Sequence, residues 1–540
     1  MQPSALAKRV YLFLLLAILA FYFYGLGAIP LVGPDEPRYA QVAREMFLRN
    51  DFVTPTLGGH TWFEKPALLY WMMILAFRGF GISEWSARVG PALCGVLTVL
   101  SVWLVARQIE HQRDTDLRSL GLWTSIATAS FLGLIVFSRA ASFDVVITMT
   151  VSWSLTFFVL YELSMRGRKP VSYLAGFYIF IGLSLIAKGL VGIVVPGGVV
   201  FVYYVLRRRL PERALFVSLL WGIPLAVGVA SVWYAPVIAK HGHIFIQEFF
   251  IEHHFARYLS NKYHHPQPFY FYPAIILLLT LPWTPVLIEA LLGIGSWTWR
   301  DHSSLTTLRV LCLAWLLFPL LFFSFSGSKL PGYILPVLPA AGLLIGERLS
   351  HTSWKERSSS WSLIASGAFC LLLSISGLVY ALKTRQVSWQ CAALVTAPLL
   401  VAGLYTVAWT NRRDVAIVSI ALAICLMAAF ALTCVAPVFG RRESVRDLLR
   451  AADERGYAGL PVLAQRGDDR STEFYASGRV VYRADGEILP IDEVTIDQAR
   501  KIGPMLVFVS TEHLDNFRRV PGMELLGDNG RVALFGWTPR

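Results

Sequence analysis

Long apolar runs, most of them close to 20 residues, organise most of this sequence. A helix of about 20 residues crosses a hydrocarbon core of about 30 Å. Lipid offers backbone groups no hydrogen-bonding partner, and the alternation typical of a barrel is absent, so helices are expected. The runs predict about thirteen transmembrane helices, at 10–28, 86–107, 119–138, 144–163, 172–188, 189–206, 214–235, 271–292, 306–325, 333–346, 361–382, 389–411 and 414–436.

One further apolar segment, residues 66–82, is short and decides the orientation of everything that follows. Basic residues in short loops mark the cytoplasmic side of a membrane protein. If this segment lies on the membrane surface, the basic loops at 166–169, 207–209, 348–357 and 412–413 are all cytoplasmic; if it spans, all of them face outward. We therefore expect a surface helix here, a cytoplasmic N-terminus and a C-terminal region outside the cytoplasm.

Composition agrees with a membrane protein, because 55% of the residues are hydrophobic and only 15% are charged. The net charge of +13 could indicate nucleic-acid binding, but residues 441–540 hold 15 basic and 16 acidic side chains, so the excess lies between the apolar runs. Membrane lipids, and no nucleic acid, are the expected partners of those cations. Six cysteines lie in or beside apolar runs without metal-type spacing, and we expect small buried residues rather than disulfide partners: Cys94, Cys312, Cys370, Cys391, Cys425 and Cys434.

The last hundred residues differ from the rest in pattern. A charged amphipathic helix is expected at 441–456, strands at 460–464, 480–482, 505–510 and 531–537, and helices at 492–502 and 512–519. Strands alternating with helices indicate a small α/β domain. We expect a transmembrane domain at 1–436, whose first periplasmic loop at 31–82 carries juxtamembrane helices, and a periplasmic α/β domain at 437–540.

Unusual polar residues gather in the first expected outer loop. Two prolines bracket Asp35 and Glu36 within GPDEPRYAQVAREM (33–46), which places both acids at the start of a helix, where carboxylates favour the helix dipole. WFEKPALLYW (62–71) follows. The alternative is an ordinary capped helix with solvated acids.

The expected topology returns other polar residues to the same side. Asp144 begins a span, and Lys188 lies at a turn between two spans. The loop at 236–270 contains EHHFARY and HHPQPFYFY, and the loop at 326–336 reads SGSKLPGYILP. Ionisable residues at the edge of the hydrocarbon are paired or functional by default.

This set of side chains suits a particular chemistry. Lys and Arg bind phosphate groups, and carboxylates act as bases or metal ligands. Lys188 and Lys329 could instead extend to lipid headgroups. Aromatic side chains suit a sugar face but also form ordinary interfacial belts; the candidates are Tyr39, Trp62, Trp71, Tyr258 and Tyr333. No P-loop, dinucleotide fingerprint or cysteine-based zinc site is found, so no nucleotide cofactor is expected.

Five motifs in order, GPDEPRYA, FEKPALLYW, EHHFARY, HHPQPFYFY and SKLPGYILPVLPA, resemble GT-C glycosyltransferases that use polyprenyl-phosphate sugars. The likeness covers residues 1–440 and is greatest to the bacterial branch related to protein mannosyltransferases, which contains the aminoarabinose transferase of lipid A. It implies a GT-C fold of transmembrane helices and outer juxtamembrane helices in the bacterial inner membrane. The sequence has Lys65-Pro66-Ala67 where the family commonly has KPP.

The resemblance also implies roles for individual residues. Asp35 matches the family's essential outer-loop acid, Asp144 a second acid, and Lys65 and Arg38 lie near the donor phosphate. Lys188 and Lys329 are further cations of the cavity, and Tyr333 matches the tyrosine of the SK-x-P-x-Y segment. Glu64 and His253, with His254 adjacent, match a pair that holds a structural zinc or another divalent cation. The remaining candidates for substrate binding are Glu36, Tyr39 and Arg257.

The implied activity is inverting transfer of a sugar, expected to be 4-amino-4-deoxy-L-arabinose, from undecaprenyl phosphate to lipid A on the periplasmic face. A protein O-glycosyltransferase or a polysaccharide glycosyltransferase on the same scaffold is the alternative. A transporter of lipid-linked sugars is a remoter one, because transporters place charges near the bilayer midplane and here they lie at the outer ends of the spans.

Overall fold

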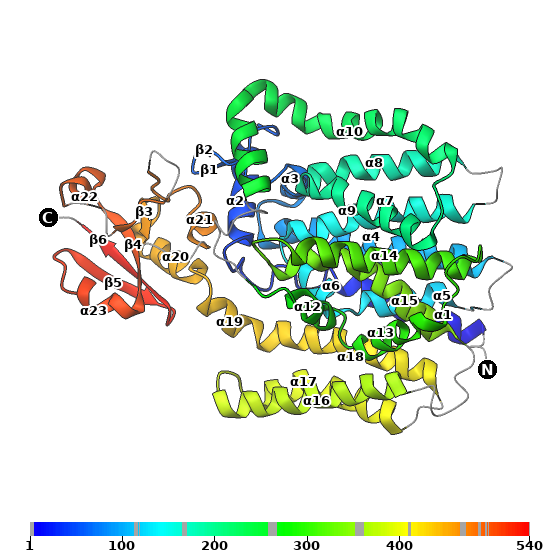
Figure 1. Cartoon of the computed structure of the whole chain (residues 1–540). Helices are drawn as coiled ribbons and strands as arrows, with labels where there is room; N and C mark the ends of the chain where they lie inside the picture. The colour runs from blue at the N-terminus through cyan, green and yellow to red at the C-terminus, as the bar shows by residue number, and fades with distance from the viewer. Residues whose placement is uncertain are drawn as a thin grey trace. The chain divides into compact units, whose positions relative to one another are not determined.

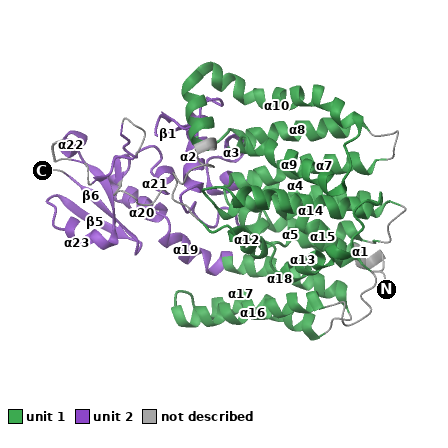
Figure 2. Cartoon of the chain, viewed as in Figure 1, with its two compact units in different colours: residues 1–24, 64–69, 90–431 green, residues 25–63, 70–89, 432–540 purple. Residues whose placement is uncertain are grey.

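The computed structural model describes residues 5–538 apart from ten short gaps. Those gaps are 113–116, 118, 165–169, 257–266, 352–360, 409–411, 465–470, 484–487, 492–493 and 495. Helices make up most of the chain (Figure 1). The chain divides into two compact units (Figure 2): unit 1 is Met1–Tyr24, Glu64–Leu69 and Gly90–Ala431, and unit 2 is Gly25–Phe63, Tyr70–Val89 and Leu432–Arg540. Most of the expected first loop therefore belongs to the same unit as the C-terminal region.

Nine helices in the described parts of the chain are long and apolar enough to cross a membrane. Eight of them are α4 (Glu84–Glu110), α7 (Phe143–Leu163), α8 (Val171–Lys188), α10 (Arg213–Phe245, continued by the π-helix Ile246–Ala256), α14 (Ser304–Ser324), α16 (Trp361–Thr384), α17 (Trp389–Ala408) and α18 (Arg413–Cys434). The ninth joins a 3-10 helix, Pro331–Val337, to α15 (Leu338–Ser350). The chain is thus a multi-pass membrane protein.

Two of the expected spans are bent pairs of helices rather than straight helices. Helices α5 (Leu120–Ala129) and α6 (Leu132–Ser138) meet at 60°, and α12 (Phe271–Leu279) meets α13 (Thr284–Leu292) and the short turn Gly293–Ser296 at 120°.

The two bends are hydrogen-bonded to each other. The Leu132 amide donates to the Leu281 carbonyl at 3.0 Å, and Trp283 Nε1 donates to Ser130 Oγ at 2.9 Å. Backbone groups freed by a break inside a membrane need such partners. The apolar pattern predicted one span at each of these places and gave no sign of a bend, because apolar content alone does not report these contacts.

Three further apolar helices are shorter. Helices α1 (Ala5–Phe21) and α9 (Val191–Arg207) lie where spans were expected, and α3 (Leu68–Phe80) lies where the surface helix was expected. By length and composition the described residues give nine spans, or up to eleven with the bent pairs, so the count of thirteen stays a prediction.

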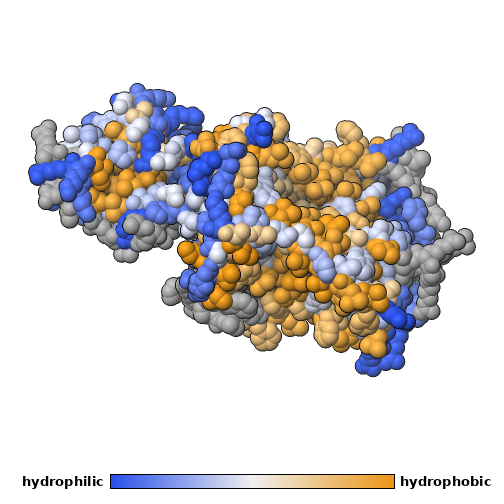
Figure 3. Space-filling model, turned by 90° about the horizontal axis from the view of Figure 1, so that it is seen from above, coloured by the Kyte–Doolittle hydropathy of each residue, from blue (hydrophilic) through white to orange (hydrophobic). Residues whose placement is uncertain are grey.

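Apolar side chains cover the outside of the helical unit, as the face in Figure 3 shows. Leu220, Phe201 and Val232 are 79%, 68% and 65% exposed. Apolar exposure on this scale would favour aggregation in water, whereas it suits contact with lipid tails.

The C-terminal part of unit 2 is built on a four-stranded sheet with the order β3-β4-β6-β5. Strand β3 (Val462–Ala464) is parallel to β4 (Met505–Ser510), and β6 (Val532–Trp537) is antiparallel to β4 and to β5 (Met523–Asp528). The short helices around it are α19 (Ala436–Arg442), α20 (Arg446–Ala452), α21 (Ser471–Tyr475), α22 (Ile496–Ile502) and α23 (Leu514–Phe517). The α/β class expected from the sequence is confirmed.

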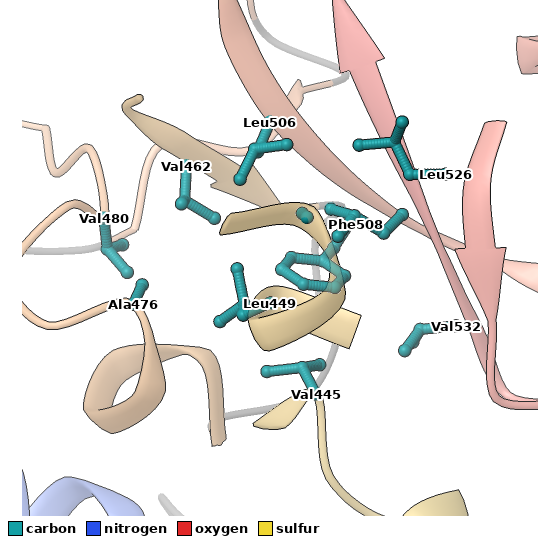
Figure 4. Packing of buried hydrophobic residues seen from close by; sticks show 11 residues of the cluster. Val445, Leu449, Val462, Ala476, Val480, Leu506, Phe508, Leu526 and Val532 are labelled. Carbon is teal, nitrogen blue, oxygen red and sulfur yellow. The ribbon is translucent and has the colours of Figure 1, made fainter. Parts of the chain in front are cut away.

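The core of this region forms where α20 packs on the sheet (Figure 4). Leu449 from α20 lies with Phe508 and Leu506 of β4 and Val532 of β6, and all four side chains are at most 2% exposed. β-branched and aromatic residues favour such a half-covered sheet.

Near the N-terminus of the same unit, α2 (Glu36–Leu48) is followed by a two-stranded hairpin of β1 (Thr56–Leu57) and β2 (His60–Thr61).

Three local expectations were wrong. The strand expected at 480–482 does not form, because Val480 and Tyr482 make isolated bridges there instead of a continuous ladder. The amphipathic helix expected at 441–456 is broken after Arg442 and resumes at Arg446, because the chain turns there to place α20 on the sheet. Cys391 and Cys434 are disulfide-bonded, although we expected buried thiols. On the predicted topology both cysteines lie at the outer ends of their helices, where oxidation is possible, and their positions 43 residues apart in sequence gave no sign of this.

Candidate functional site

Three of the residues singled out in the sequence meet in unit 1. Lys188, the last residue of α8, forms an ion pair with the carboxylate of Asp144 in the first turn of α7. The Lys188 ammonium also lies 4.6 Å from the ring centroid of Tyr333. The Lys188 and Asp144 side chains are 15% and 20% exposed, so water screens this pair less than a surface pair.

Local sequence explains how Asp144 is held. Ser142 caps α7 and accepts a hydrogen bond from the Asp144 amide at 3.1 Å. Gly332 lies against the carboxylate so closely that a Cβ on it would collide with Asp144 Oδ2. The chain between α14 and α15 can therefore approach the acid only because residue 332 has no side chain.

The same loop carries a second cation. Lys329 is 8% exposed, and its ammonium donates to the Gln267 carbonyl at 3.0 Å. Tyr272, in the first turn of α12, is fully buried, and its hydroxyl donates to the Leu330 carbonyl at 3.4 Å. Segments near residues 270 and 330 thus lie together beside the Asp144–Lys188 pair.

Glu64 and Lys65 also belong to unit 1 and pair with each other at 2.7 Å, with side chains 10% and 13% exposed. Among the residues that the structure describes, no three His, Cys, Asp or Glu side chains group as a metal site. A structural zinc normally has four ligands, and Glu64 with His253 supplies two. The described residues therefore do not complete the implied zinc site, which stays a prediction.

In unit 2, α2 carries the other acidic candidates. Asp35 occupies the N-cap position, is exposed, and its carboxylate makes no hydrogen bond or ion pair with any described residue. The Arg38 guanidinium lies 5.3 Å from the ring centroid of Trp62. Tyr39 is 5% exposed, and its ring packs edge-on against the ring of Tyr70, with 6.4 Å between the two ring centroids. Of these residues, Asp35 is the one that presents a free side chain.

The segment that leads to Asp35 is fixed by a buried arginine that the sequence analysis missed. Arg88, 4% exposed in α4, binds both carboxylate oxygens of Glu36 at 2.9 and 2.7 Å. It also donates to the carbonyls of Leu26, Ile29 and Pro30 at 2.7–2.9 Å. A charged residue near the start of a long apolar run was the available signal. Glu36, a candidate for substrate binding, thus has both oxygens occupied by Arg88.

The C-terminal region holds this segment from a second direction. The Tyr475 hydroxyl accepts a hydrogen bond from the Leu31 amide at 2.7 Å and donates to Glu84 at 3.0 Å. Burial, and then the negative charge of Glu84, raise the pKa of Tyr475 well above its usual value, so the hydroxyl keeps its proton. Arg44 of α2 donates to the Phe474 carbonyl at 3.1 Å.

Arg257 lies outside the described residues, so its position is not assessed, and the same holds for His264 and His265. In unit 1, cations are set in a nearly buried environment and an acid is paired with one of them. In unit 2, a free carboxylate lies at the start of a helix. Cations in a water-poor setting stabilise charge that develops on a phosphate. A carboxylate can orient or deprotonate an attacking group.

Comparisons with known proteins fit this chemistry. The family model described as dolichyl-phosphate-mannose-protein mannosyltransferase matches residues 64–233. The undecaprenyl phosphate-alpha-4-amino-4-deoxy-L-arabinose arabinosyl transferase of Aeromonas salmonicida is 30% identical over 409 residues, 74% of this chain and 72% of that protein. The protein of the same name from Serratia proteamaculans is 31% identical over 340 residues, 61% of this chain and 58% of that protein. The chain thus aligns with less than two thirds of the Serratia relative's length.

The crystal structure of ArnT from Cupriavidus metallidurans bound to undecaprenyl phosphate resembles this chain with a TM-score of 0.80. The match covers 99% of this chain and 98% of that chain at 22% identity, which shows a shared fold. The fold is shared over nearly the whole chain, and the Aeromonas relative aligns with 74% of it. This chain therefore belongs to the family of membrane glycosyltransferases that the undecaprenyl phosphate-alpha-4-amino-4-deoxy-L-arabinose arabinosyl transferases represent.

Proposed function

We propose that this chain transfers 4-amino-4-deoxy-L-arabinose from undecaprenyl phosphate to a phosphate of lipid A, on the periplasmic face of the bacterial inner membrane. The observation that carries the proposal is the 30% identity over 409 residues to a relative whose name states this sugar and this lipid carrier. The cations beside Asp144 and the free carboxylate of Asp35 are the groups that such a reaction needs.

In the proposed reaction, a phosphate oxygen of the acceptor attacks the anomeric carbon of the sugar. The bond from that carbon to the lipid phosphate breaks, and undecaprenyl phosphate leaves with the electron pair. Negative charge grows on the leaving phosphate, so cations next to it favour the transition state over the ground state. Lys188 is our first candidate, because Asp144 and Tyr333 hold it in a nearly buried position. Lys65 and Arg38 are the others.

The proposed role of Asp35 depends on the acceptor. A lipid A phosphate is already ionised at neutral pH and needs no base, so Asp35 would orient the sugar or the acceptor. A hydroxyl acceptor must lose a proton, and a free carboxylate could then serve as the base. The exposure of Asp35 and its lack of a partner among described residues leave the carboxylate available for either role.

Reconstituted transfer tests the proposal. Purified chain in proteoliposomes receives undecaprenyl phosphate-linked aminoarabinose and lipid A, and mass spectrometry follows both the modified lipid A and the released undecaprenyl phosphate. We expect the two products to rise together and to fall with Asp35→Asn. Consumption of donor only when a peptide or polysaccharide replaces lipid A would favour the alternative acceptors. Donor that crosses the bilayer intact, with no product, would favour a transporter.

A further inference from the structure

A second polar site lies in unit 2, apart from the candidate catalytic residues. It is a pocket of about 390 Å³ lined by three arginines, Arg441 from α19 and Arg446 and Arg450 from α20. Asp447 and Glu454 are its acidic lining residues, so cations predominate. The three arginines lie within ten residues of sequence, on two short helices. The chain turns between these helices, after Arg442, so that both contribute to the same pocket.

The charges of the pocket are only partly neutralised by the protein. Arg446 pairs with Glu84 and with Asp447, each at 3.1 Å. Arg441 and Arg450 are exposed and make no ion pair with any described residue. A guanidinium presents a planar fork of donors that matches the oxygens of a phosphate. The pocket is therefore suited to a phosphate-bearing ligand.

The position of the pocket in the chain indicates that this ligand is a lipid. Pro437, which also lines it, comes three residues after the last residue of the transmembrane helix α18. Val438 and Phe439, between that residue and Arg441, are 48% and 60% exposed. Exposed apolar side chains followed at once by arginines are typical of a segment at the level of the headgroups. On the topology that the loop charges predict, this is the outer leaflet.

The other wall of the pocket is the segment that leads to Asp35. Ala28 and Pro30 line the pocket, and the Pro30 carbonyl is bound by Arg88. Arg446 shares the Glu84 carboxylate with Tyr475, whose hydroxyl accepts from the Leu31 amide. A phosphate in the pocket would thus contact the same rigid segment that presents the candidate catalytic acid.

We propose that this arginine pocket binds the phosphate group of a phosphorylated lipid of the outer leaflet and so docks the acceptor lipid. The inference rests on the proposed function for the identity of that lipid as the acceptor, whereas binding itself can be measured without turnover. Arg441 and Arg450 supply the free cations, and Glu454 opposes the phosphate by its negative charge.

Binding is tested on the full-length chain in detergent, with undecaprenyl phosphate present at saturation to occupy the donor site. The probe is dioctanoyl phosphatidic acid, and dioctanoyl glycerol is the same lipid without phosphate. We expect the Kd of the Arg441→Gln/Arg450→Gln double variant for the phosphatidic acid to rise at least about tenfold, since each charge-assisted hydrogen bond contributes roughly a factor of ten. Glu454→Gln should lower the Kd. The double variant Arg518→Gln/Arg519→Gln removes the same charge from two exposed arginines of the same region, so it is the charge-matched control and should leave the Kd unchanged.

Unchanged Kd values in both the double variant and Glu454→Gln would overturn the proposal. Equal affinity of the wild-type chain for inorganic phosphate and for the phosphatidic acid would overturn the assignment to a lipid. Arg441 and Arg450 are exposed, so we expect the double variant to fold like the wild-type chain, and an unchanged melting temperature checks this.

Steady-state transfer separates docking from chemistry. The double variant should raise KM for lipid A about tenfold while kcat and KM for the donor stay the same, because the pocket binds the acceptor before reaction. A fall in kcat with an unchanged acceptor KM would contradict docking. Absence of transfer by the wild-type chain would count against the proposed function, and the binding experiment would still decide whether the pocket takes a lipid phosphate.

Discussion

Replacing Lys188 by glutamine tests the proposed charge stabilisation most sharply. The Lys188 ammonium is held by Asp144 and lies 4.6 Å from the ring centroid of Tyr333, with 15% of the side chain exposed. Loss of one preorganised group that stabilises developing charge costs about 2–4 kcal/mol of barrier. At 1.36 kcal/mol per tenfold, that is a fall in kcat of roughly 30- to 800-fold.

Asp144, the ion-pair partner of Lys188, should influence the effect of this substitution. Without Lys188, the Asp144 carboxylate loses its partner and repels the leaving phosphate. Lys188→Gln combined with Asp144→Asn should therefore be less impaired than the product of the two single effects, with a coupling energy of about 0.5–3 kcal/mol, as for other residues in contact. Lys188→Arg should recover part of the activity, because the cation is restored.

The assay is single-turnover release of undecaprenyl phosphate from bound donor, measured for each variant at equal folded concentration. Lys501→Gln, an exposed lysine of α22, is the matched control and should behave like wild type. A single-turnover rate constant for Lys188→Gln within about threefold of wild type, with an intact fold, would refute the role of this lysine. Strictly multiplicative effects of the two single variants would refute its coupling to Asp144.

Three further predictions concern the framework of the site. Arg88→Met should lower stability by about 3–5 kcal/mol, because the nearly buried Glu36 carboxylate loses its positive partner and three carbonyls lose the donor that Arg88 supplies; an unchanged melting temperature would contradict this. Gly332→Ala should reduce kcat with a smaller effect on melting temperature, since its Cβ would displace the Asp144 carboxylate, and wild-type kcat would argue against that contact. Reduction of the disulfide between Cys391 and Cys434 should lower the melting temperature, because a disulfide typically contributes about 2–4 kcal/mol to the free energy of unfolding. Identical thermal unfolding curves with and without reductant would contradict this prediction.

The helices were largely predictable because each apolar run carries its own signal. Every expected span coincides with a helix or a bent pair, and the helix Leu68–Phe80 forms within the segment 66–82, whose position on the membrane surface stays a prediction. The bends were not predictable, because they depend on hydrogen bonds such as that between Leu132 and Leu281, which are distant in sequence. In the C-terminal region the expected strands at 505–510 and 531–537 appear, whereas β5 was missed because MELLGD lacks clear alternation and carries two acids.

In the candidate site, too, some features were predictable from the sequence and others were not. Topology alone predicted that Asp144, Lys188 and Tyr333 would share one side, and the structure places them in contact. Arg88 and Tyr475 escaped notice because their importance lies in partners far along the chain, Glu36 and Leu31. Networks of this kind follow from tertiary packing, which no local pattern reports.

Mass spectrometry of lipid A tests the central claim most directly. Cells that lack this chain are compared with cells in which the wild-type chain or Asp35→Asn is restored to the membrane at equal levels. The account predicts an added mass of aminoarabinose on a lipid A phosphate with the wild-type chain and little or none with the variant. Lipid A that is identical in all three, with the protein present and the donor being made, would contradict the assignment of sugar and acceptor.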